Sequence, residues 1–408
     1  MNKCFITKLP SSVDNDNLPV LGQLRINWSK QSDLTDNDAR AIGLATNDSI
    51  TIKVSGAHLT DSTLSSNLGN TKTITAADNA VWLYVSNDAD AVLTIDNKYS
   101  LTYLNFNKSS KPALKCSVEF DINDIRYCTA LTTIGLMNTQ VSGDISAISQ
   151  LTSLTFINFE NTNVSGDISA ISKLTSLTNF SFKNTNVSGD ISVLSQLTSL
   201  NIIFLANTNV SGNISAISKL TGLIIIELNN TQVSGDISSV SQLTKLNNLN
   251  LDSTQVSGNI SSVSQLTALT VLNLNNTQVS GEIDSLANLT KLAMFNGLKG
   301  LSLTGDMSKI PANVRFISQL GRKVTTNFTW TANGRKNVTL LALEGPIPFD
   351  TASMDNMLID QATCTVSPNA TQPYQKVISV SGTRTSASDA AVTAIQNMGV
   401  TISGVVKV

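Results

Sequence analysis

The most regular feature of the chain is a spacing of apolar residues that repeats every 23 positions from Cys128 to Asn288. Seven units follow one another without insertion, and they begin at Cys128, Leu151, Leu174, Leu197, Leu220, Leu243 and Leu266. The fourth, seventh and ninth positions of each unit predict a short parallel strand with apolar side chains pointing inward. A Val, an Ile and the next Leu close the coil from the other side. Each unit is too thin to bury its own apolar side, so neighbouring units must stack into a solenoid.

A known repeat family shares this pattern. The second unit, LTSLTFINFENTNVSGDISAISK, has the form LxxLxxLxLxNTxVSGxIxxxxx. It resembles the leucine-rich-repeat family, most closely the plant-type LSGxIP variant. The chain departs from that variant in two ways: Thr stands where Asn is usual after the strand, with Asn one position earlier, and Ser replaces the Pro of the IP step. The resemblance implies a leucine-rich-repeat solenoid with a parallel β-sheet on one face and short turns or 3-10 segments on the other.

Two polar rows recur with the apolar ones. The first row is Thr, preceded by Asn in six of the seven units, and both side chains are expected to hydrogen-bond the backbone where the strand becomes a turn. Its members are Thr139, Thr162, Thr185, Thr208, Thr231, Thr254 and Thr277. The second row is Gly, expected where the coil bends or two backbones approach closely, and not as a phosphate loop. It comprises Gly143, Gly166, Gly189, Gly212, Gly235, Gly258 and Gly281.

The segments flanking the repeats predict four parts of the chain. An eighth unit follows at Leu289; its GLSLTGDMSKIP stretch is one residue longer than in the regular units and reaches Pro311, and a degenerate leading unit spans residues 98–127. Residues 98–311 are therefore assigned to the solenoid, with regular units over 128–288. Residues 31–97 contain strand-like runs such as SITIKV, AVWLYV and AVLTI and predict a β-rich N-terminal cap. Residues 312–408 predict an α/β C-terminal cap, with strands at NVTLLALEG and KVISVSG and a helix from the N-cap Ser388 to Gly399.

Residues 1–30 are expected to form an extended anchor arm. The segment FITKLPSSVDNDNLPVLGQLRI resembles an N-terminal segment of virion proteins of crAss-like and related tailed phages of gut bacteria. The resemblance implies attachment to other virion proteins, whereas a frayed terminus is the alternative. The start lacks the apolar h-region of a signal peptide, and no run approaches the roughly 20 apolar residues of a membrane span. The expected location is the virion after synthesis in the host cytoplasm, with the bacterial cell surface as the alternative.

Composition argues against several classes of partner. The chain has 27 Lys and Arg against 29 Asp and Glu, so its net charge of -2 offers no field for nucleic acid or anionic lipid. The single histidine is His58, and the four cysteines fall at no metal-ligand spacing; they are Cys4, Cys116, Cys128 and Cys364. We therefore expect free thiols, no membrane insertion and no cofactor.

The candidate ligand-binding surface follows from comparing the units with one another. Their VSGDIS segments are almost identical, but the sixth, eighth and tenth positions vary, and these point outward onto the face that is concave in this family. Several of them are apolar where small polar residues would suffice, which indicates a partner. The predicted site is Phe156, Asn158, Glu160, Ile202, Phe204, Ile225, Glu227, Asn250 and Val271. The occupant is expected to be a host-surface protein or glycan, a neighbouring virion subunit in a possible homo-oligomer, or the chain's own cap.

A row of acidic and amide residues raises the question of a metal. Its members, Asp144, Asp167, Asp190, Asn213, Asp236, Asn259 and Glu282, are expected to stack at strand spacing. They could recruit Ca²⁺, but no turn supplies six converging oxygens, so a hydrated edge without metal is the favoured interpretation.

Catalysis has little support in the sequence. There is no GxSxG elbow, no HExxH and no Walker loop. Two carboxylates among Glu160, Glu227 and Asp252 could in principle lie at a glycosidase spacing. The leading hypothesis is a non-enzymatic binding or structural protein of a bacteriophage virion. The alternatives are a bacterial cell-surface leucine-rich-repeat adhesin or interaction protein and, more distantly, a glycan-degrading enzyme.

Overall fold

A computed structural model describes the residues 24–28, 41–46, 50–55, 59–60, 67–69, 71–74, 81–85, 91–96, 101–106, 118–297, 301–311, 314, 316–318, 328–331, 342–364 and 377–408. Residues 1–23 of the expected arm, together with Cys4, Cys116 and His58, lie outside this set. The chain divides into two units, Met1–Val210 and Ser211–Val408, and each is described by itself.

The first unit begins with antiparallel strands. They are β1 (Leu24–Trp28), β2 (Ala41–Thr46), β3 (Ile50–Ser55), β4 (Leu59–Thr60), β5 (Asn67–Gly69), β6 (Thr71–Ile74), β7 (Val81–Val85), β8 (Ala91–Asp96), β9 (Leu101–Asn105) and β10 (Val118–Glu119). One sheet has the order β10-β1-β8-β3-β6, and β9, β2, β7, β4 and β5 pair in that order in another. The expected strands in SITIKV, AVWLYV and AVLTI are confirmed as β3, β7 and β8.

Strand β1 corrects the boundary of the expected arm. Its five residues were assigned to an extended attachment segment, but they pair with β8 along their whole length and with β10 at Asn27 and Trp28. The reason is visible in the sequence LRINW, where apolar and polar residues alternate with the period of a strand. The sheet therefore begins before residue 30.

The leading unit joins this β-rich region to the repeats. Strand β9 pairs antiparallel with β2 on one side and parallel with the first repeat strand, β11 (Thr133–Gly135), on the other. Asp121 bridges Ser142 of the next coil and caps the 3-10 helix η3 (Ile122–Ile125). Strand β9 and η3 both lie within the expected leading unit over 98–127.

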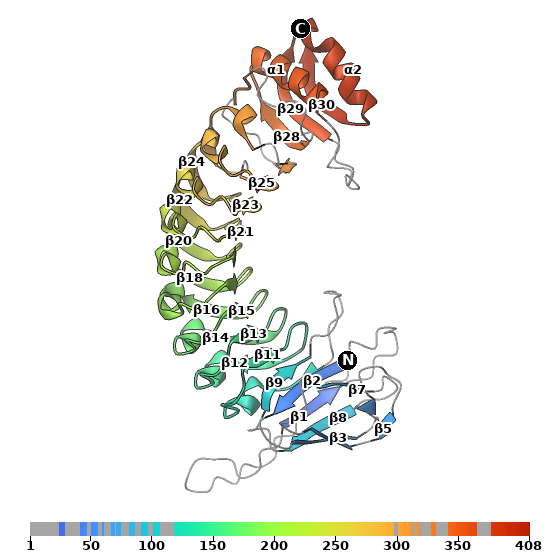
Figure 1. Ribbon diagram of the computed structural model, residues 1–408, viewed down its shortest axis with the longest axis vertical. Coiled ribbons are helices and arrows are strands. Elements are labelled where there is room, and N and C mark those ends of the chain that lie inside the picture. The colour runs from blue at the N-terminus through green and yellow to red at the C-terminus, as the bar shows by residue number, and fades with distance from the viewer. Residues whose placement is uncertain are drawn as a thin grey trace. The chain divides into compact units, whose positions relative to one another are not determined.

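Every regular coil has the same three parts, as Figure 1 shows for the green and yellow segments. In the first unit the repeat strands are β11, β13 (Phe156–Asn158), β15 (Asn179–Ser181) and β17 (Ile202–Phe204). The second parallel sheet contains β12 (Ser142–Asp144), β14 (Asn163–Asp167) and β16 (Asn186–Asp190). The 3-10 helices are η4 (Ile145–Ile148), η5 (Ile168–Ile171) and η6 (Ile191–Gln196). The apolar rows that define the repeat are fully buried between these parts.

The turn after each repeat strand depends on the Asn-Thr pair. Thr162 donates its hydroxyl proton to the Phe159 carbonyl at 2.7 Å, and the other six threonines of the row make the same bond, as expected. The Asn before each Thr has a left-handed backbone; Asn184, for example, has φ 57°. In the first unit the side chains of this row also bond to one another, which the sequence did not indicate: Asn184 donates to Asn161 of the preceding coil at 2.6 Å.

Glycine is needed in the second sheet for both reasons that the sequence indicated. Gly166 has φ 110°, and a Cβ atom there would lie 2.5 Å from Oδ1 of Asp144 in the preceding coil. The backbone therefore passes too close to the neighbouring cap for any other residue.

The second unit is built from coils of the same kind. Its repeat strands are β19 (Ile225–Glu227), β21 (Asn248–Asn250), β23 (Val271–Asn273), β25 (Met294–Asn296) and β27 (Phe316–Ser318). The second sheet contains β18 (Asn209–Asn213), β20 (Gln232–Asp236), β22 (Gln255–Asn259), β24 (Gln278–Glu282) and β26 (Ser302–Thr304). Only residues 211–213 of β18 belong to the second unit. The 3-10 helices are η7 (Ile214–Ile217), η8 (Ile237–Val240), η9 (Ile260–Val263), η10 (Ile283–Leu286) and η11 (Met307–Lys309). Strands β25 and β26 confirm the eighth unit.

The C-terminal part extends the parallel sheet with longer strands. Strand β28 (Ala342–Pro348) pairs with β27 and with β29 (Val377–Arg384), which pairs with β30 (Thr401–Lys407). Helix α1 (Thr351–Ala362) connects β28 to β29, and α2 (Asp389–Asn397) connects β29 to β30; both lie beside these strands in Figure 1. The strands at LALEG and VISVSG and the helix before Gly399 were expected from the sequence, whereas α1 and β30 were not. None of the helices that the structure describes is long and apolar enough to cross a membrane.

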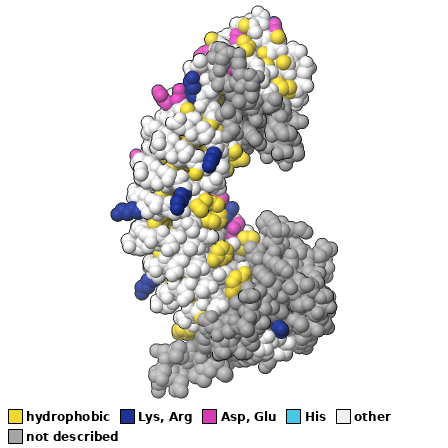
Figure 2. Space-filling model, in the orientation of Figure 1, with side chains coloured by type: hydrophobic (Ala, Val, Ile, Leu, Met, Phe, Trp, Pro, Cys, Tyr) yellow, Lys and Arg dark blue, Asp and Glu magenta, His cyan; other side chains and the backbone are white. Residues whose placement is uncertain are grey.

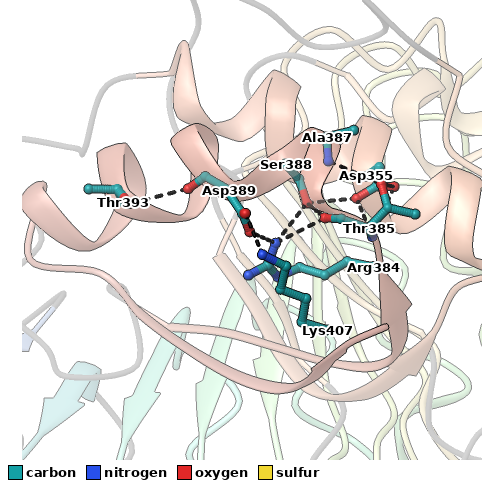
Figure 3. Close-up of polar contacts among 8 residues, drawn as sticks. All are labelled: Asp355, Arg384, Thr385, Ala387, Ser388, Asp389, Thr393 and Lys407. Atoms are coloured by element: carbon teal, nitrogen blue, oxygen red, sulfur yellow. Dashed lines mark hydrogen bonds and ion pairs between the residues drawn. The ribbon is translucent and has the colours of Figure 1, made fainter.

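A buried carboxylate holds the two helices together. Asp355 of α1 accepts hydrogen bonds from the Ser388 hydroxyl at 2.6 Å and from the Thr385 hydroxyl at 2.7 Å (Figure 3). Burial alone would raise the pKa of Asp355, but these bonds and the charge of Arg384 outweigh it and lower the pKa below its ordinary value. Ser388 precedes α2 as expected, yet its side chain bonds to Asp355 instead of capping the helix.

Candidate functional site

The strand face of each unit consists of the side chains at the sixth, eighth and tenth repeat positions. In β13 and β17 the seventh-position residue is buried and its two neighbours are half-buried, which confirms the outward orientation of the sixth and eighth positions. Figure 2 shows hydrophobic side chains gathered in patches along the repeats, on a surface of mostly neutral polar side chains and backbone. All nine residues of the predicted site stand at the sixth, eighth or tenth position of their units.

In the first unit, three apolar side chains form what we call the N-terminal patch: Phe156, Ile202 and Phe204. The register places Phe156 beside Asn179, and Asn179 beside Ile202, so two strand spacings of about 4.8 Å separate the two apolar residues. Phe204 lies two residues along the same strand as Ile202. All three are half-buried and not fully exposed as expected, because flanking side chains on strands this close cover part of each.

Polar groups border the N-terminal patch on the same strands. Asn158 uses its carbonyl oxygen to accept a bond from the Glu160 backbone N–H at 3.0 Å, which fixes the direction of its amide. Glu160 forms an ion pair with Lys183 at 4.0 Å. The surface therefore combines apolar side chains with oriented amides and has no net charge at this pair.

The second unit has an apolar set of its own, the C-terminal patch: Ile224, Ile225, Val271 and Met294. Val271 and Met294 are register partners on β23 and β25. Ile225 is the partner of Asn248, which is in turn the partner of Val271. Ile224 and Met294 are 41% and 39% exposed and are the most exposed large apolar side chains of the described repeats.

The sequence analysis missed Ile224 and Met294, although signals for both were present. Met294 is at the sixth position of the eighth unit, and the predicted site was drawn only from the seven regular units. Ile224 is at the fifth position, where Thr155 and Thr178 donate hydroxyl protons to the carbonyl of the preceding coil at 3.1 and 2.9 Å. Isoleucine gives up that structural bond for an exposed apolar side chain, which favours a role in binding.

The remaining predicted residues lie beside the C-terminal patch. Glu227 and Asn250 are register partners on β19 and β21 and are half-buried. Asn250 accepts a bond from the Asp252 backbone N–H at 3.2 Å, as Asn158 does from Glu160 in the first unit. The amide at the eighth position thus has both a turn-forming role and a surface role.

The acidic row has a function that the sequence interpretation did not foresee. Asp167 Oδ1 accepts a bond from the Ser169 backbone N–H at 2.8 Å and caps η5. Five other members cap their 3-10 helices in the same way, and only Glu282 does not. The Ser169 backbone N–H, followed by its hydroxyl, lowers the pKa of Asp167, and the Ser238 groups do the same for Asp236. The row is an exposed edge whose side chains are occupied by capping.

The structure also bears on the other chemical candidates. Among the described residues, no group of three or more His, Cys, Asp or Glu side chains could hold a metal ion. Cys128 and Cys364 are buried free thiols. Of the carboxylates considered for glycoside cleavage, Glu160 is paired with Lys183, and Asp252 accepts bonds from Ser253 and Asn276. Both are therefore engaged in contacts within the repeat.

Comparisons with known proteins agree with this coil geometry. No family model matches the chain, and no curated protein matches it. Among solved structures, the plant peptide hormone receptor RGFR1 in complex with RGF2 is 19% identical with a TM-score of 0.52, and the match covers 71% of this chain and 50% of that one. The fold is a leucine-rich-repeat solenoid. At this identity the likeness concerns the fold alone, and the chain spans about half the length of that receptor.

Two further solenoids of this kind were found. The LRR ectodomain of the receptor kinase GASSHO1/SCHENGEN3 from Arabidopsis thaliana is 17% identical with a TM-score of 0.43, over 71% of this chain and 42% of that one. Internalin C2 from Listeria monocytogenes is 26% identical with a TM-score of 0.39, over 50% of this chain and 82% of that one. In the leucine-rich-repeat solenoid described above, the varied strand face is the candidate binding surface.

Proposed function

We propose that this protein is a non-enzymatic binding protein whose strand face takes a protein ligand. The observation that carries the proposal is the N-terminal patch. Phe156, Ile202 and Phe204 stand at positions whose side chains the coil does not need, whereas the buried and capping positions repeat almost unchanged. An apolar side chain kept at such a position is stabilised by contact with a partner.

The size of the patch limits how the ligand is held. Full burial of one large apolar side chain is worth about 1.5 to 3 kcal/mol, so covering three half-buried ones contributes roughly 2 to 4 kcal/mol. Association costs at least about 4 kcal/mol because the two partners lose translational and rotational freedom. The ligand must therefore also bond to the oriented amides and contact further strands. A protein segment, which offers both apolar side chains and backbone N–H and C=O groups, meets this requirement.

We propose further that the protein belongs to a bacteriophage virion, where the N-terminal segment attaches it to other virion proteins. The support is the resemblance of FITKLPSSVDNDNLPVLGQLRI to segments of phage virion proteins. The ligand of the strand face is then a host-surface protein or a neighbouring virion subunit. A bacterial cell-surface leucine-rich-repeat protein fits the fold equally well and is the second candidate.

Electron microscopy with gold-labelled antibody against the repeats separates these two locations. Label on the heads or tails of particles released from the host culture is the expected result. Label on intact uninfected cells, with unlabelled particles, would contradict the virion location and support the cell-surface alternative.

A glycan-degrading activity is tested separately. We expect that incubation of the protein with bacterial capsular polysaccharide releases no new reducing ends. New ends that disappear in the Glu227→Gln variant would overturn the non-enzymatic assignment.

A further inference from the structure

Strand β30 is the outermost strand of the parallel sheet among the residues that the structure describes. Among the strands that the structure describes, β30 pairs with β29 only. Val408 donates its backbone N–H to the Arg384 carbonyl at 2.9 Å, and Arg384 is the register partner of Lys407. Because successive residues of a strand turn their backbone groups to opposite sides, Val405 and Lys407 direct their N–H and C=O groups away from β29. No other described strand pairs with these groups, so they can bond to an added strand.

The side chains along this edge are apolar and exposed. Val406 and Val408 are 62% and 71% exposed and are the most exposed large apolar residues of the described chain. Natural proteins protect a free edge with charge, especially lysine, because unpaired strands associate. Here Lys407 is the only charged residue of β30, and Asp389 of α2 binds its ammonium group at 2.5 Å (Figure 3). The same carboxylate also pairs with Arg384, so the ammonium group is held in place at one end of the strand, and the three groups together keep one positive charge.

The strand is also complementary to itself. In an antiparallel pair related by a two-fold axis at Gly404, Ile402 lies opposite Val406 of the second copy. Thr401 then lies opposite Lys407, which keeps the two lysines at opposite ends of the pair. Gly404 itself has φ 77°, and a Cβ atom there would overlap the Val380 carbonyl oxygen of β29, so no side chain stands at the centre of the edge. Cross-strand apolar pairs of this kind stabilise antiparallel sheets.

We propose that β30 is a dimerisation strand that pairs antiparallel with β30 of a second copy of this chain. The backbone groups of Val405 and Lys407 form the new hydrogen bonds, and the exposed valines lose solvent contact. The two parallel sheets join into one across the two-fold axis. This interface is separate from the strand face assigned to ligand binding.

Sedimentation velocity of the full chain over about 1 to 100 μM tests the proposal. We expect a concentration-dependent monomer-dimer equilibrium. The Val405→Pro variant removes an outward N–H from each copy without touching the β29 pairing, and two such bonds are worth about a 30-fold weaker dimer. The Val406→Lys variant removes both apolar cross-strand pairs and is expected to weaken the dimer about tenfold.

A charge-matched control is available on the neighbouring helix. Gln396 is exposed on α2, so the Gln396→Lys variant changes the net charge as Val406→Lys does and should leave the dimer unchanged. A chain that stays monomeric at all concentrations overturns the proposal. A dimer that is equally stable in the wild type, Val405→Pro and Val406→Lys also overturns it, because another surface would then make the contact.

Discussion

At the scale of single residues, the repeat depends on a backbone conformation that few amino acids accept. Asn138, Asn161 and Asn184 have φ values near 60°, and Ser253 takes the same conformation where Asn is absent. Asn tolerates this region better than other residues because its short amide can bond locally. In the first unit the amides also bond to one another between coils, from Asn207 to Asn184 and from Asn184 to Asn161.

Substitution of Asn184 separates the two roles. The Asn184→Ala variant must place a Cβ-bearing residue with no local bond at φ 57°, and we expect it to lose about 1 to 2 kcal/mol of unfolding free energy. The Asn184→Gly variant also loses the amide bonds to Asn161 and Asn207, but glycine adopts a positive φ without strain. It should therefore be the more stable of the two variants. This reverses the usual order of Ala and Gly. Urea denaturation of both variants checks it; equal or higher stability of Asn184→Ala would show that the conformation carries no strain.

Two glycines make a second residue-level test. The Gly166→Ala variant adds a Cβ atom 2.5 Å from Asp144, whereas at Gly399, with φ 75°, the added Cβ meets nothing within 4 Å. We expect Gly399→Ala to cost about 1 kcal/mol, the penalty of the backbone alone, and Gly166→Ala to cost clearly more. Thermal denaturation of the pair measures the difference. Similar losses would mean that the close approach between coils relaxes without cost.

At the scale of elements, the 3-10 helices of six of the seven regular coils begin at a capping side chain, which is Asp in four coils and Asn in two. Both residues cap through the same oxygen, and only Asp titrates. The lowered folded-state pKa values of Asp167 and Asp236 mean that these two caps stabilise the fold fully above the unfolded value of about 3.9 and lose this contribution as the pH falls through the folded values. The capping row is therefore a source of acid sensitivity.

The Asp167→Asn, Asp236→Asn double variant tests this directly. Its stability at pH 7 should stay within about 0.5 kcal/mol of the wild type, since Asn caps as well as Asp. Between pH 7 and pH 3 it should lose less stability than the wild type, because two carboxylates with lowered pKa values are gone. Urea midpoints at the two pH values give the comparison. Parallel losses in both proteins would show that the caps do not contribute to the pH dependence.

Asp355 is the corresponding test for the C-terminal elements. In the Asp355→Asn variant one carboxylate oxygen becomes an NH₂ group that faces donors, so the hydrogen bond from either Ser388 or Thr385 is lost and we expect a destabilisation of about 1 to 3 kcal/mol. The matched control is Thr393→Ala, which removes an exposed hydroxyl bond on α2 and should cost little. Hydrogen exchange of α1 and α2 reports the loss locally. Unchanged protection of both helices in Asp355→Asn would contradict the role of the buried carboxylate.

The elements also show what the sequence could and could not predict. The 23-residue spacing determined the coil, its buried rows and the Thr and Gly positions, because each repeats and is set by local geometry. Helix α1 was missed because its sequence TASMDNMLIDQA buries Asp355 and Asp360, which a pattern of apolar residues does not reveal. The site positions followed from the strand period, but Ile224 stands outside that pattern, and the degree of burial of Phe156 and Phe204 depends on neighbouring strands.

At the scale of the whole molecule, the two parallel sheets of the repeats differ in their outward side chains. The second sheet presents Asn or Gln, then Ser, in every regular coil, as in Asn163 and Ser165. The strand face changes from coil to coil and includes apolar residues in both units. A constant polar surface like that of the second sheet is enough to keep a solenoid soluble. The variation of the strand face is therefore the feature that supports the proposed binding role.

The Phe204→Asp variant should leave this solenoid folded. Phe204 is half-buried at the surface and the buried core of its coil is formed by Ile203 and Leu205. We expect its unfolding free energy to fall by no more than about 1 kcal/mol, as for most surface substitutions. Circular dichroism melting checks this. A large loss would mean that Phe204 serves packing and would remove the basis of the N-terminal patch as a binding site.

Panning a displayed peptide library against the full chain tests the central claim most directly, because the library itself supplies candidate ligands. Enriched peptides should bind the wild type and the Asn163→Asp control, which alters the second sheet. They should lose at least about tenfold in affinity for Phe204→Asp, because a buried apolar contact of about 1.5 kcal/mol is removed and a charge is added. Peptides that bind Phe204→Asp as well as the wild type, or that lose binding only with Asn163→Asp, would contradict the assignment of the strand face as the ligand-binding surface.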